Sequence, residues 1–427
     1  MKSKIILTIF LFAATTLFAQ DTLTVMHYNL LNYGNYTDYC TTINNNINEK
    51  DEYIRTIIDY VKPDIFTVNE ISPSLAIQQR LLDNDLNING ITHYKKANFI
   101  KVAESDIVNM LYYNSHKLQL HSHMIIQSYI RDIDLYKLYY RSEDLPAGDT
   151  AFVICVVAHL KSSTGVDNED KRLFMVNNAM DYLNSYSDNN NYLFMGDFNV
   201  YSSNEPGYQL LTNYFNPTLN FYDPINTPGN WNNNYSYRFV HTQSTHASSS
   251  GCASTGGMDD RFDFILISDK IKQGSEYVEY IDGSYTAIGQ DGLHFNKSIN
   301  DTPTNLSAPS NVIETLYGNS DHLPVLIKLR VDKTLGIPDH LHSLFTEIIF
   351  NNPVAEDFEL TIWAKTNTDV KIEIWNISGV LVFSDEKKIV RGQNRLNYNL
   401  RWLNTGIYIA VFTDGENSRI VKKVVKK

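Results

Sequence analysis

Short apolar runs recur along residues 22–330 and are separated by polar stretches of uneven length. Each run is rich in β-branched or aromatic residues and is bounded by turn-forming residues, which is the pattern of a buried β-strand. The runs predict strands at Leu23–Tyr28, Ile65–Asn69, Ile107–Tyr113, Phe152–His159, Tyr192–Gly196, Phe262–Ile267 and Val325–Leu329.

Two segments between these strands have the spacing of amphipathic helices. In Lys50–Val61 one helical face collects Tyr53, Ile54, Ile57, Ile58 and Val61, and Pro63 is expected to end the helix. Arg172–Leu183 repeats the pattern. Strands that alternate with helices predict a layered α/β domain rather than an all-β one.

Two long stretches lack apolar periodicity. Tyr222–Asp260 is crowded with Asn, Ser, Thr and Gly, and Gly283–Asn319 is a second polar stretch. We expect both to be long surface loops, and loops of this kind often border active sites.

The pattern changes after a boundary near Val331–Phe345. The remaining residues predict an all-β region with hairpin turns at 376–379 and 414–415. Frequent short strands in a region of this size favour a small sandwich. The expected strands are Phe358–Ala364, Val370–Trp375, Val380–Ser384, Arg395–Leu400 and Ile407–Thr413.

The N-terminus has the layout of a secretory signal peptide. Lys2 and Lys4 precede an apolar run from Ile5 to Leu17, and Ala19 offers a small residue for cleavage. The run is shorter than the roughly 20 apolar residues of a membrane span. We predict a signal peptide at residues 1–19 and no stable membrane span elsewhere.

Composition changes this picture little. The 427 residues carry a formal net charge of −12, which argues against bulk adhesion to nucleic acid but does not exclude a nuclease with a local basic patch. Of the three cysteines, Cys155 lies in a predicted strand and is expected in the core. Cys40 and Cys252 lie in polar surroundings and could pair in an oxidising compartment.

Polar residues with chemical potential follow the apolar runs closely. Each alone could be a cap or a satisfied interior residue, but so many at corresponding strand ends favour a common site, because open α/β sheets gather their sites there. The candidates are Asn29, Glu70, His159, Asp197, Asn199, Asp263, Asp321 and His322.

These residues suit the hydrolysis of phosphoesters. Glu70, Asp321 and the amide oxygen of Asn29 are ligands of the kind that Mg²⁺ prefers, with Mn²⁺ or Ca²⁺ as alternatives. Asp197 could orient or deprotonate a water molecule. Asp263 could hold His322 in its cationic form beside a phosphate. His159 and Lys161, two residues apart, could both reach the phosphate.

Six short motifs follow one another along the chain. They are Met26-His27-Tyr28-Asn29, Pro63-Asp64-Ile65 through Asn69-Glu70, His159-Leu160, Gly196-Asp197-Phe198-Asn199, Arg261-Phe262-Asp263-Phe264-Ile265-Leu266 and Ser320-Asp321-His322-Leu323-Pro324-Val325. Their order resembles the endonuclease/exonuclease/phosphatase family over about residues 22–331. This resemblance implies a four-layer α/β sandwich of two packed mixed sheets flanked by helices.

The resemblance also implies roles for single residues. Asn29, Glu70 and Asp321 would form the metal site. Asp197 and Asn199 would position the water and the phosphate. His322, oriented by Asp263, would stabilise the phosphate, and His159 would contact it and assist the leaving group. The family's further phosphate-binding Arg or Tyr is not placed by any motif, and the alternatives are Arg131, Tyr136 and Arg141.

The C-terminal region resembles the sorting domain carried by substrates of the type IX secretion system. Phe350-Asn351-Asn352-Pro353-Val354 stands where that domain opens with Tyr-Pro-Asn-Pro, with Asn in place of the first Pro, and Gly406-Ile407-Tyr408 and the Lys-rich end also fit. The alternative is a generic binding sandwich. We predict a catalytic domain at 20–331, a linker at 332–345 and a sorting domain at 346–427, in a protein exported through the periplasm and secreted or held at the cell surface.

The motifs define the reaction but not the substrate. We expect a nuclease, with nucleic acid as the substrate, the secretion machinery as the second partner and a monomeric state. Exposed Tyr residues in the Tyr222–Arg261 stretch could stack on bases while Arg238 and Arg261 meet phosphates. The alternatives are a sphingomyelinase-type or other lipid or small-molecule phosphoesterase, and an inactive adhesin.

Overall fold

The computed structural model describes residues 21–145, 150–186, 190–248, 251–333, 344–415 and 419–427. The chain divides into two compact units, Met1–Leu335 and Gly336–Lys427. The predicted signal peptide at 1–19 lies outside the described residues, and so does most of the predicted linker at 332–345. The predicted domain boundaries therefore stay predictions.

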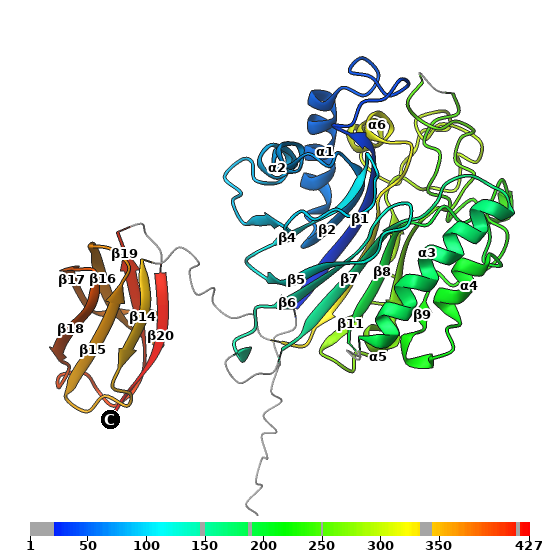
Figure 1. The fold of residues 1–427 in the computed structure, drawn as a ribbon. Coiled ribbons are helices and arrows are strands. Elements are labelled where there is room, and N and C mark those ends of the chain that lie inside the picture. The colour runs from blue at the N-terminus through cyan, green and yellow to red at the C-terminus, as the bar shows by residue number, and fades with distance from the viewer. Residues whose placement is uncertain (1–20, 146–149, 187–189, 249–250, 334–343, 416–418) are drawn as a thin grey trace, which may run out of the picture. The chain divides into compact units, whose positions relative to one another are not determined.

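The first unit is built on two mixed β-sheets (Figure 1). One sheet has the order β11 (Val278–Tyr280), β13 (Val325–Val331), β1 (Asp21–Tyr33), β2 (Ile65–Ile71), β4 (Val108–Asn114) and β3 (Tyr94–Lys96), with β12 (Thr286–Ala287) paired to β13. The other has the order β5 (Leu118–Gln127), β6 (Ile133–Tyr140), β7 (Phe152–His159), β8 (Tyr192–Asp197), β10 (Asp263–Ser268) and β9 (Phe221–Tyr222). In each sheet one central pair is parallel, β1 with β2 and β7 with β8, and the other pairs are antiparallel.

The two sheets pack face to face, with helices on both outer faces. Alternate residues of β1 show this: Leu23 and Val25 belong to the core shared with the other sheet, whereas Met26 and Tyr28 belong to the core under the helices. This arrangement confirms the predicted four-layer α/β sandwich. The first sheet is covered by α1 (Ile47–Val61), α2 (Leu75–Leu81), the π-helix η1 (Leu82–Leu86) and α6 (Ser310–Asn319), and the second by α3 (Val166–Ser185) and α4 (Pro206–Thr212).

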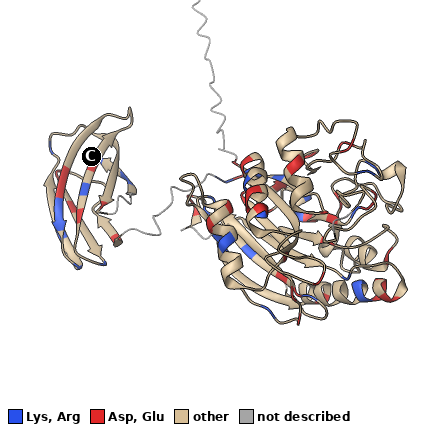
Figure 2. Ribbon diagram, turned by 90° about the horizontal axis from the view of Figure 1, so that it is seen from above, with Lys and Arg blue, Asp and Glu red and all other residues tan. Residues whose placement is uncertain are grey.

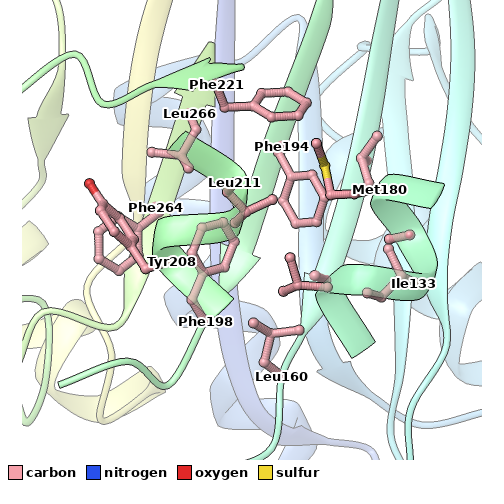
Figure 3. Close-up of a cluster of buried hydrophobic side chains, with 14 of the residues drawn as sticks. Ile133, Leu160, Met180, Phe194, Phe198, Tyr208, Leu211, Phe221, Phe264 and Leu266 are labelled. Atoms are coloured by element: carbon pink, nitrogen blue, oxygen red, sulfur yellow. The ribbon is translucent and has the colours of Figure 1, made fainter. Parts of the chain in front are cut away.

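A dense aromatic core fixes α3 and α4 on the second sheet (Figure 3). Phe198 stacks on Phe264 with ring centroids 4.9 Å apart, and Phe194 packs edge-on against both Phe198 and Phe221. All four rings are buried. Because packed rings leave little room for movement, this core holds the ends of β8 and β10 in place. The remaining short elements are α5 (Asp269–Gln273) and the 3₁₀ helices η3 (Pro217–Leu219) and η4 (Tyr235–Tyr237).

Every predicted strand of the first unit corresponds to an observed one, and both predicted helices lie within α1 and α3. The side chain of Asn46 caps α1, which ends as predicted before Pro63. The prediction of a loop throughout Gly283–Asn319 is wrong, because α6 occupies its last ten residues. The apolar side chains Val312, Ile313 and Leu316 are too few to stand out in the sequence, but they pack on the first sheet.

The second unit is a small β-sandwich, as predicted. Its two sheets enclose a single core that includes Phe358, Ile372 and Phe412. The predicted strands are all present, but the first and last strands were not predicted. The sheets are β14 (Phe345–Phe350), β15 (Asp357–Ala364) and β18 (Gly392–Asn399), and β17 (Leu381–Ile389), β16 (Thr368–Asn376), β19 (Gly406–Asp414) and β20 (Arg419–Lys426).

Two further properties bear on the predicted location and partners. Within the described part of the chain, no helix is both long and apolar enough to cross a membrane. Acidic residues outnumber basic ones by 48 to 36, and residues of both signs are scattered over the elements of the first unit in Figure 2. Any attraction for a polyanion must therefore come from individual cationic side chains rather than from net charge.

Candidate active site

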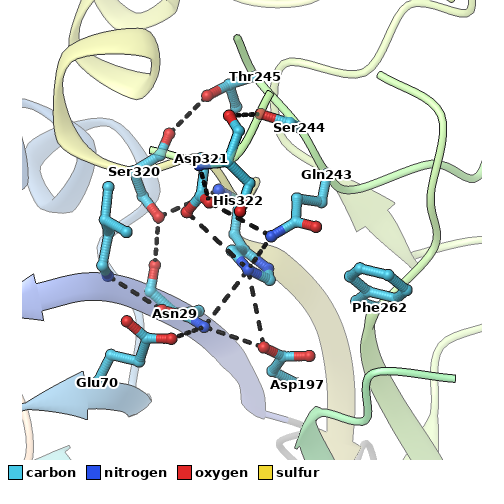
Figure 4. Close-up of polar contacts among 12 residues, drawn as sticks. Asn29, Glu70, Asp197, Gln243, Ser244, Thr245, Phe262, Ser320, Asp321 and His322 are labelled. Atoms are coloured by element: carbon cyan, nitrogen blue, oxygen red, sulfur yellow. Dashed lines mark hydrogen bonds and ion pairs between the residues drawn. The ribbon is translucent and has the colours of Figure 1, made fainter. Parts of the chain in front are cut away.

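The ends of four strands bring the predicted residues to one place. Asn29 lies towards the end of β1, Glu70 towards the end of β2, His159 at the end of β7 and Asp197 at the end of β8. His159 stands beside Asp197 in the parallel register of β7 and β8. The two sheets meet at this edge, since the side chain of Asn29 reaches across to Asp197 (Figure 4).

Asn29 connects the carboxylates of the two sheets. Its Nδ2 donates to Oε1 of Glu70 at 3.2 Å and to Oδ2 of Asp197 at 3.0 Å. Its Oδ1 accepts the backbone N–H of Leu31 at 3.0 Å. The amide oxygen that we expected to face a cation is therefore turned to the backbone, and the amide nitrogen faces the carboxylates.

His322 and Asp263 form the expected pair. Nδ1 of His322 lies 2.8 Å from Oδ2 of Asp263, which is fully buried and also accepts the Thr242 hydroxyl at 2.7 Å. Burial lowers the pKa of His322, but the carboxylates of Asp263 and Asp197 outweigh it and hold this pKa well above its ordinary value. The ring is therefore an imidazolium at neutral pH, with Nε2 3.7 Å from Oδ2 of Asp197.

Asp197 is buried and held from two sides. Its backbone N–H donates to Oδ1 of Asn69 at 2.9 Å, and its Oδ1 accepts the backbone N–H of Asn199 at 3.0 Å. Burial raises the pKa of Asp197 to about 7; His322 opposes this shift, and Asp263 and Glu70 add to it. A carboxylate with this pKa can take up a proton near neutral pH, which suits a general base.

His159 faces the same carboxylates. Its Nε2 lies 3.4 Å from Oδ2 of Asp197 and 3.8 Å from Oε1 of Glu70. Burial and then the nearby Arg131 hold the pKa of His159 well below its ordinary value, so this imidazole is neutral. The ligand atoms of Glu70, His159 and Asp197 all lie within 4.8 Å of one another, a spacing that could hold a metal ion.

Asp321 precedes His322 in the sequence, and its Oδ1 lies 4.0 Å from Nε2 of that ring. Its Oδ2 accepts the backbone N–H of Ser254 at 2.8 Å and Nε2 of Gln243 at 3.4 Å. Its Oδ1 is buried without a hydrogen-bond partner. A buried carboxylate oxygen without a partner is costly unless a cation or water completes it.

The backbone is strained at two of these residues. Glu70 has φ +57° and Asn199 has φ +52°, in a backbone region that residues other than glycine seldom occupy. Such strain collects at functional sites, where the surrounding structure imposes it. Gly196 precedes Asp197 because a Cβ there would overlap the carbonyl oxygen of Ala158.

An open cavity of about 390 Å³ lies above the cluster. Arg131, His159, Asn199, Gln243 and His322 are among its lining residues. Arg131 is placed by the turn between β5 and β6, where Nη1 donates to the carbonyl oxygen of Leu160 at 2.7 Å.

Arg131, Tyr136 and Arg141, the three alternatives for the further phosphate-binding residue, differ in whether they line this cavity. Tyr136 is fully buried and stacks on His123, and Arg141 donates to the carbonyl oxygen of Ser115 at 2.7 Å. Of the three, only Arg131 lines the cavity. Lys161, which we expected at the phosphate, donates to the carbonyl oxygen of Ser162 and is not among the lining residues.

Gln243 and Lys50 were not predicted. The side-chain amide of Gln243 lies 2.7 Å from Nε2 of His322, and nothing in its polar surroundings indicated this position. Nζ of Lys50 donates to the carbonyl oxygens of Leu31 and Asn319 at 2.9 and 2.7 Å, and so ties β1 to the end of α6. Burial lowers the pKa of Lys50 to about 7, against the opposing effect of Asp321 and Glu70. The position of Lys50 on the apolar face of the predicted helix was the one feature of the sequence that could have indicated its burial.

The expected phosphate role of Arg261 is wrong. Its guanidinium is buried and bonded to both carboxylate oxygens of Asp223, with Nη1 and Nη2 at 2.7 and 2.8 Å. It also lies over the rings of Trp231 and Phe264. Arg261 is therefore a structural ion pair that anchors the long loop to the second sheet.

A disulfide joins the two loops that wall the cavity. Cys40 and Cys252 are bonded across a sequence separation of 212 residues, and Cys155 is a free buried thiol, as expected. Cys252 lines the cavity, as do Tyr39 and Ser254, each close in sequence to one of the two cysteines. The bond therefore holds the Ser254 N–H in reach of Asp321.

The chain belongs to the Endonuclease/Exonuclease/phosphatase family, whose sequence profile matches residues 26–287. Members of this family are hydrolases that act on phosphoester bonds. Residues 348–427 match the profile of the Secretion system C-terminal sorting domain. A domain of this type directs a chain to the secretion machinery, so the protein is exported to the cell surface or beyond it.

Solved structures with a similar arrangement cover about three quarters of the chain. A family member from Bacteroides thetaiotaomicron has 14% identity and a TM-score of 0.46, and the match covers 74% of this chain and 96% of that one. The catalytic domain of human Nocturnin with bound sulfate has 15% identity and a TM-score of 0.43, and the match covers 73% of this chain and 97% of that one. A humanized TDP2 from D. rerio has 12% identity and a TM-score of 0.45, and the match covers 72% of this chain and 98% of that one. No curated protein sequence matches the chain.

Breaking the disulfide should loosen the cavity wall. The double variant Cys40→Ser, Cys252→Ser should lose about 2–4 kcal/mol of unfolding free energy. Its turnover should fall about tenfold or more, because Ser254 is no longer held at Asp321. Phosphoester hydrolysis with and without reductant measures this. The double variant serves as the control, since reductant should not affect it further. Equal turnover of oxidised and reduced wild-type protein would contradict the expectation.

Proposed function

We propose that the protein is a secreted, divalent-metal-dependent phosphodiesterase and that nucleic acid is its substrate. The observation that supports this most directly is the pair of His322 and Asp263, 2.8 Å apart, directed at the buried carboxylate of Asp197. A fixed cation and a proton acceptor that both line an open cavity are the parts that a phosphodiester hydrolase needs.

The donor set fits a hard divalent cation. Glu70 would be the main ligand, with Asp197 and His159 within reach, and the unpartnered Oδ1 of Asp321 would be a further donor. Asn29, predicted as a ligand, would orient the carboxylates of Glu70 and Asp197 through its amide nitrogen. When bound, Mg²⁺, or Mn²⁺ or Ca²⁺ in its place, would stabilise negative charge on the phosphoryl and leaving-group oxygens.

Asp197 would accept the proton of the attacking water. Its pKa of about 7 leaves enough carboxylate at neutral pH, and its hydrogen bond from Asn29 fixes the direction of Oδ2. Asn199, with its strained backbone next to the general base, would orient the water or the phosphate through its side-chain amide.

The charged donors around the cavity would hold the phosphate. Nε2–H of the His322 imidazolium and the guanidinium of Arg131 would donate to non-bridging oxygens. His159 is neutral, so it would assist the leaving group as a neutral hydrogen-bond donor rather than as a charged acid.

Nucleic acid is favoured over lipid because Arg238 offers a separate cationic position on the loop that leads into the site. A lipid phosphoesterase of the sphingomyelinase type stays the second candidate, since the long loop also exposes Tyr235 and Phe239. An inactive adhesin with the same fold is disfavoured, because such a protein would have no use for an intact set of buried carboxylates and strained site residues.

Hydrolysis with Mg²⁺, with and without chelator, tests the proposal on plasmid DNA, RNA, sphingomyelin and a phosphomonoester. Wild-type protein should cleave nucleic acid, and chelator should abolish cleavage. Glu70→Gln should lower turnover by at least about a hundredfold at an unchanged melting temperature, because the principal anionic ligand is lost. Full activity of this variant would remove Glu70 from the site, and turnover of lipid alone would replace the substrate.

The imidazolium should also be essential. His322→Ala should lower kcat by about 10²–10⁴, and Asp263→Asn should lower it by a smaller factor because the ring then loses the main group that raises its pKa. His294→Gln is the matched control, since this histidine is also paired with a carboxylate, Asp291, at 2.9 Å. Steady-state kinetics measures kcat, and an unchanged value for His322→Ala would exclude this role.

Removing residues 346–427 should separate activity from export. The second unit has its own core, so the shortened protein should keep its activity in solution. It should fail to reach the cell surface, because the sorting domain is gone. Activity assays of purified protein and fractionation of cells measure the two effects. A shortened protein that is inactive after purification would show that the second unit does more than direct export.

A further inference from the structure

Arg238 lies against two exposed aromatic rings on the long loop. Its guanidinium carbon is 4.2 Å from the ring centroid of Tyr235 and 4.3 Å from that of Phe239. These rings are 60% and 58% exposed, so both are accessible to a ligand from solvent. Contacts of this kind stabilise a cation at the surface by covering its faces.

The local structure holds the three side chains in place. The 3₁₀ helix η4 is capped by Asn234, whose side chain accepts the N–H of Ser236. Tyr235 packs edge-on against Phe295, and Phe239 lies so close to Gly292 that a Cβ there would overlap its ring. The guanidinium is also fixed by its own bond from Nη1 to the carbonyl oxygen of Tyr235 at 3.2 Å.

The charge environment of Arg238 differs from that of other arginines in the first unit. Other arginines of the first unit are neutralised, as Arg172 is by Glu205 at 2.8 Å and Arg261 by Asp223 at 2.7 Å. Among the described residues, no carboxylate lies within ion-pair distance of Arg238. Within the described part of the chain, the one hydrogen bond of the guanidinium goes to the carbonyl oxygen of Tyr235, which leaves further N–H groups for a ligand, and a planar fork of donors fits a phosphate group.

Arg238 is close in sequence to a residue of the catalytic cluster. Arg238 precedes Gln243 by five residues, and the side-chain amide of Gln243 lies 2.7 Å from Nε2 of His322. Five residues span at most about 18 Å even when fully extended. One strand of a duplex carries a phosphate every ~3.4 Å of rise, so the backbone positions of Arg238 and Gln243 lie no farther apart than a strand of a few nucleotides.

We propose that Arg238, held against the rings of Tyr235 and Phe239, binds a second phosphate of the substrate. The substrate is then a chain of phosphodiesters, that is, a nucleic acid strand, because a sphingomyelin-type lipid carries a single phosphate. This inference rests on the proposed nucleic-acid phosphodiesterase activity and adds a second phosphate-binding position to it.

Comparison of a short and a long substrate tests the inference. Wild-type protein and Arg238→Gln are assayed on bis(p-nitrophenyl) phosphate, which has one phosphate, and on a single-stranded oligonucleotide. Arg238→Gln should lower kcat/KM for the oligonucleotide about tenfold and leave the small diester unchanged. The slope of log kcat/KM against log salt for the oligonucleotide should become less steep by about 0.7, as expected for one lost phosphate contact on a single strand.

Two controls keep the outcomes distinct. Arg391→Gln, an exposed arginine of the second unit, removes the same charge elsewhere and should change neither substrate. Arg238→Lys keeps the charge but not the planar fork and should recover part of the loss. If wild-type protein hydrolyses neither substrate, the proposed function fails. If it hydrolyses both and Arg238→Gln loses equally on both, or on neither, the second phosphate site is overturned. Both proteins are also assayed on sphingomyelin vesicles, and a loss confined to this substrate would overturn the second phosphate site in favour of a lipid.

Discussion

The face-to-face packing of two mixed sheets is the constraint on which the site depends. The core between them is made by alternate apolar residues of the central strands, such as Val25 of β1 and Val157 of β7. Because this core fixes the two sheets against each other, the ends of their parallel strands meet at one edge. Asn29 can then bond to Asp197 across the sheets, a contact between residues 168 positions apart.

The price of that arrangement is the burial of several carboxylates. Asp197, Asp263 and Asp321 are each almost inaccessible to solvent. Burial of anions is tolerated only where partners compensate it, and here the imidazolium of His322 lies among all three. The same burial raises the pKa of Asp197 to about 7, against the opposing effect of His322. A stable arrangement of these charges and a useful proton acceptor thus have one physical origin.

The outer wall of the site is held by covalent and aromatic contacts rather than by sheet hydrogen bonds. The disulfide between Cys40 and Cys252 joins two polar loops that have little apolar surface to pack. The buried ion pair of Arg261 and Asp223 anchors the long loop to the second sheet. These anchors allow the loop to present Arg238 and its two rings at a defined position without a core of its own.

The sequence by itself determined the central strands, two helices and the eight candidate residues of the site, since apolar periodicity and short motifs are local properties. It did not determine β5 and β6, whose turn brings Arg131 into the cavity, or the place of Gln243 and Lys50 beside the site. It also assigned Arg261 to the surface, because a guanidinium buried against Asp223 looks the same in sequence as an exposed one. Only the tertiary structure decides such cases, because the partner that neutralises or frees a polar side chain comes from a distant part of the chain.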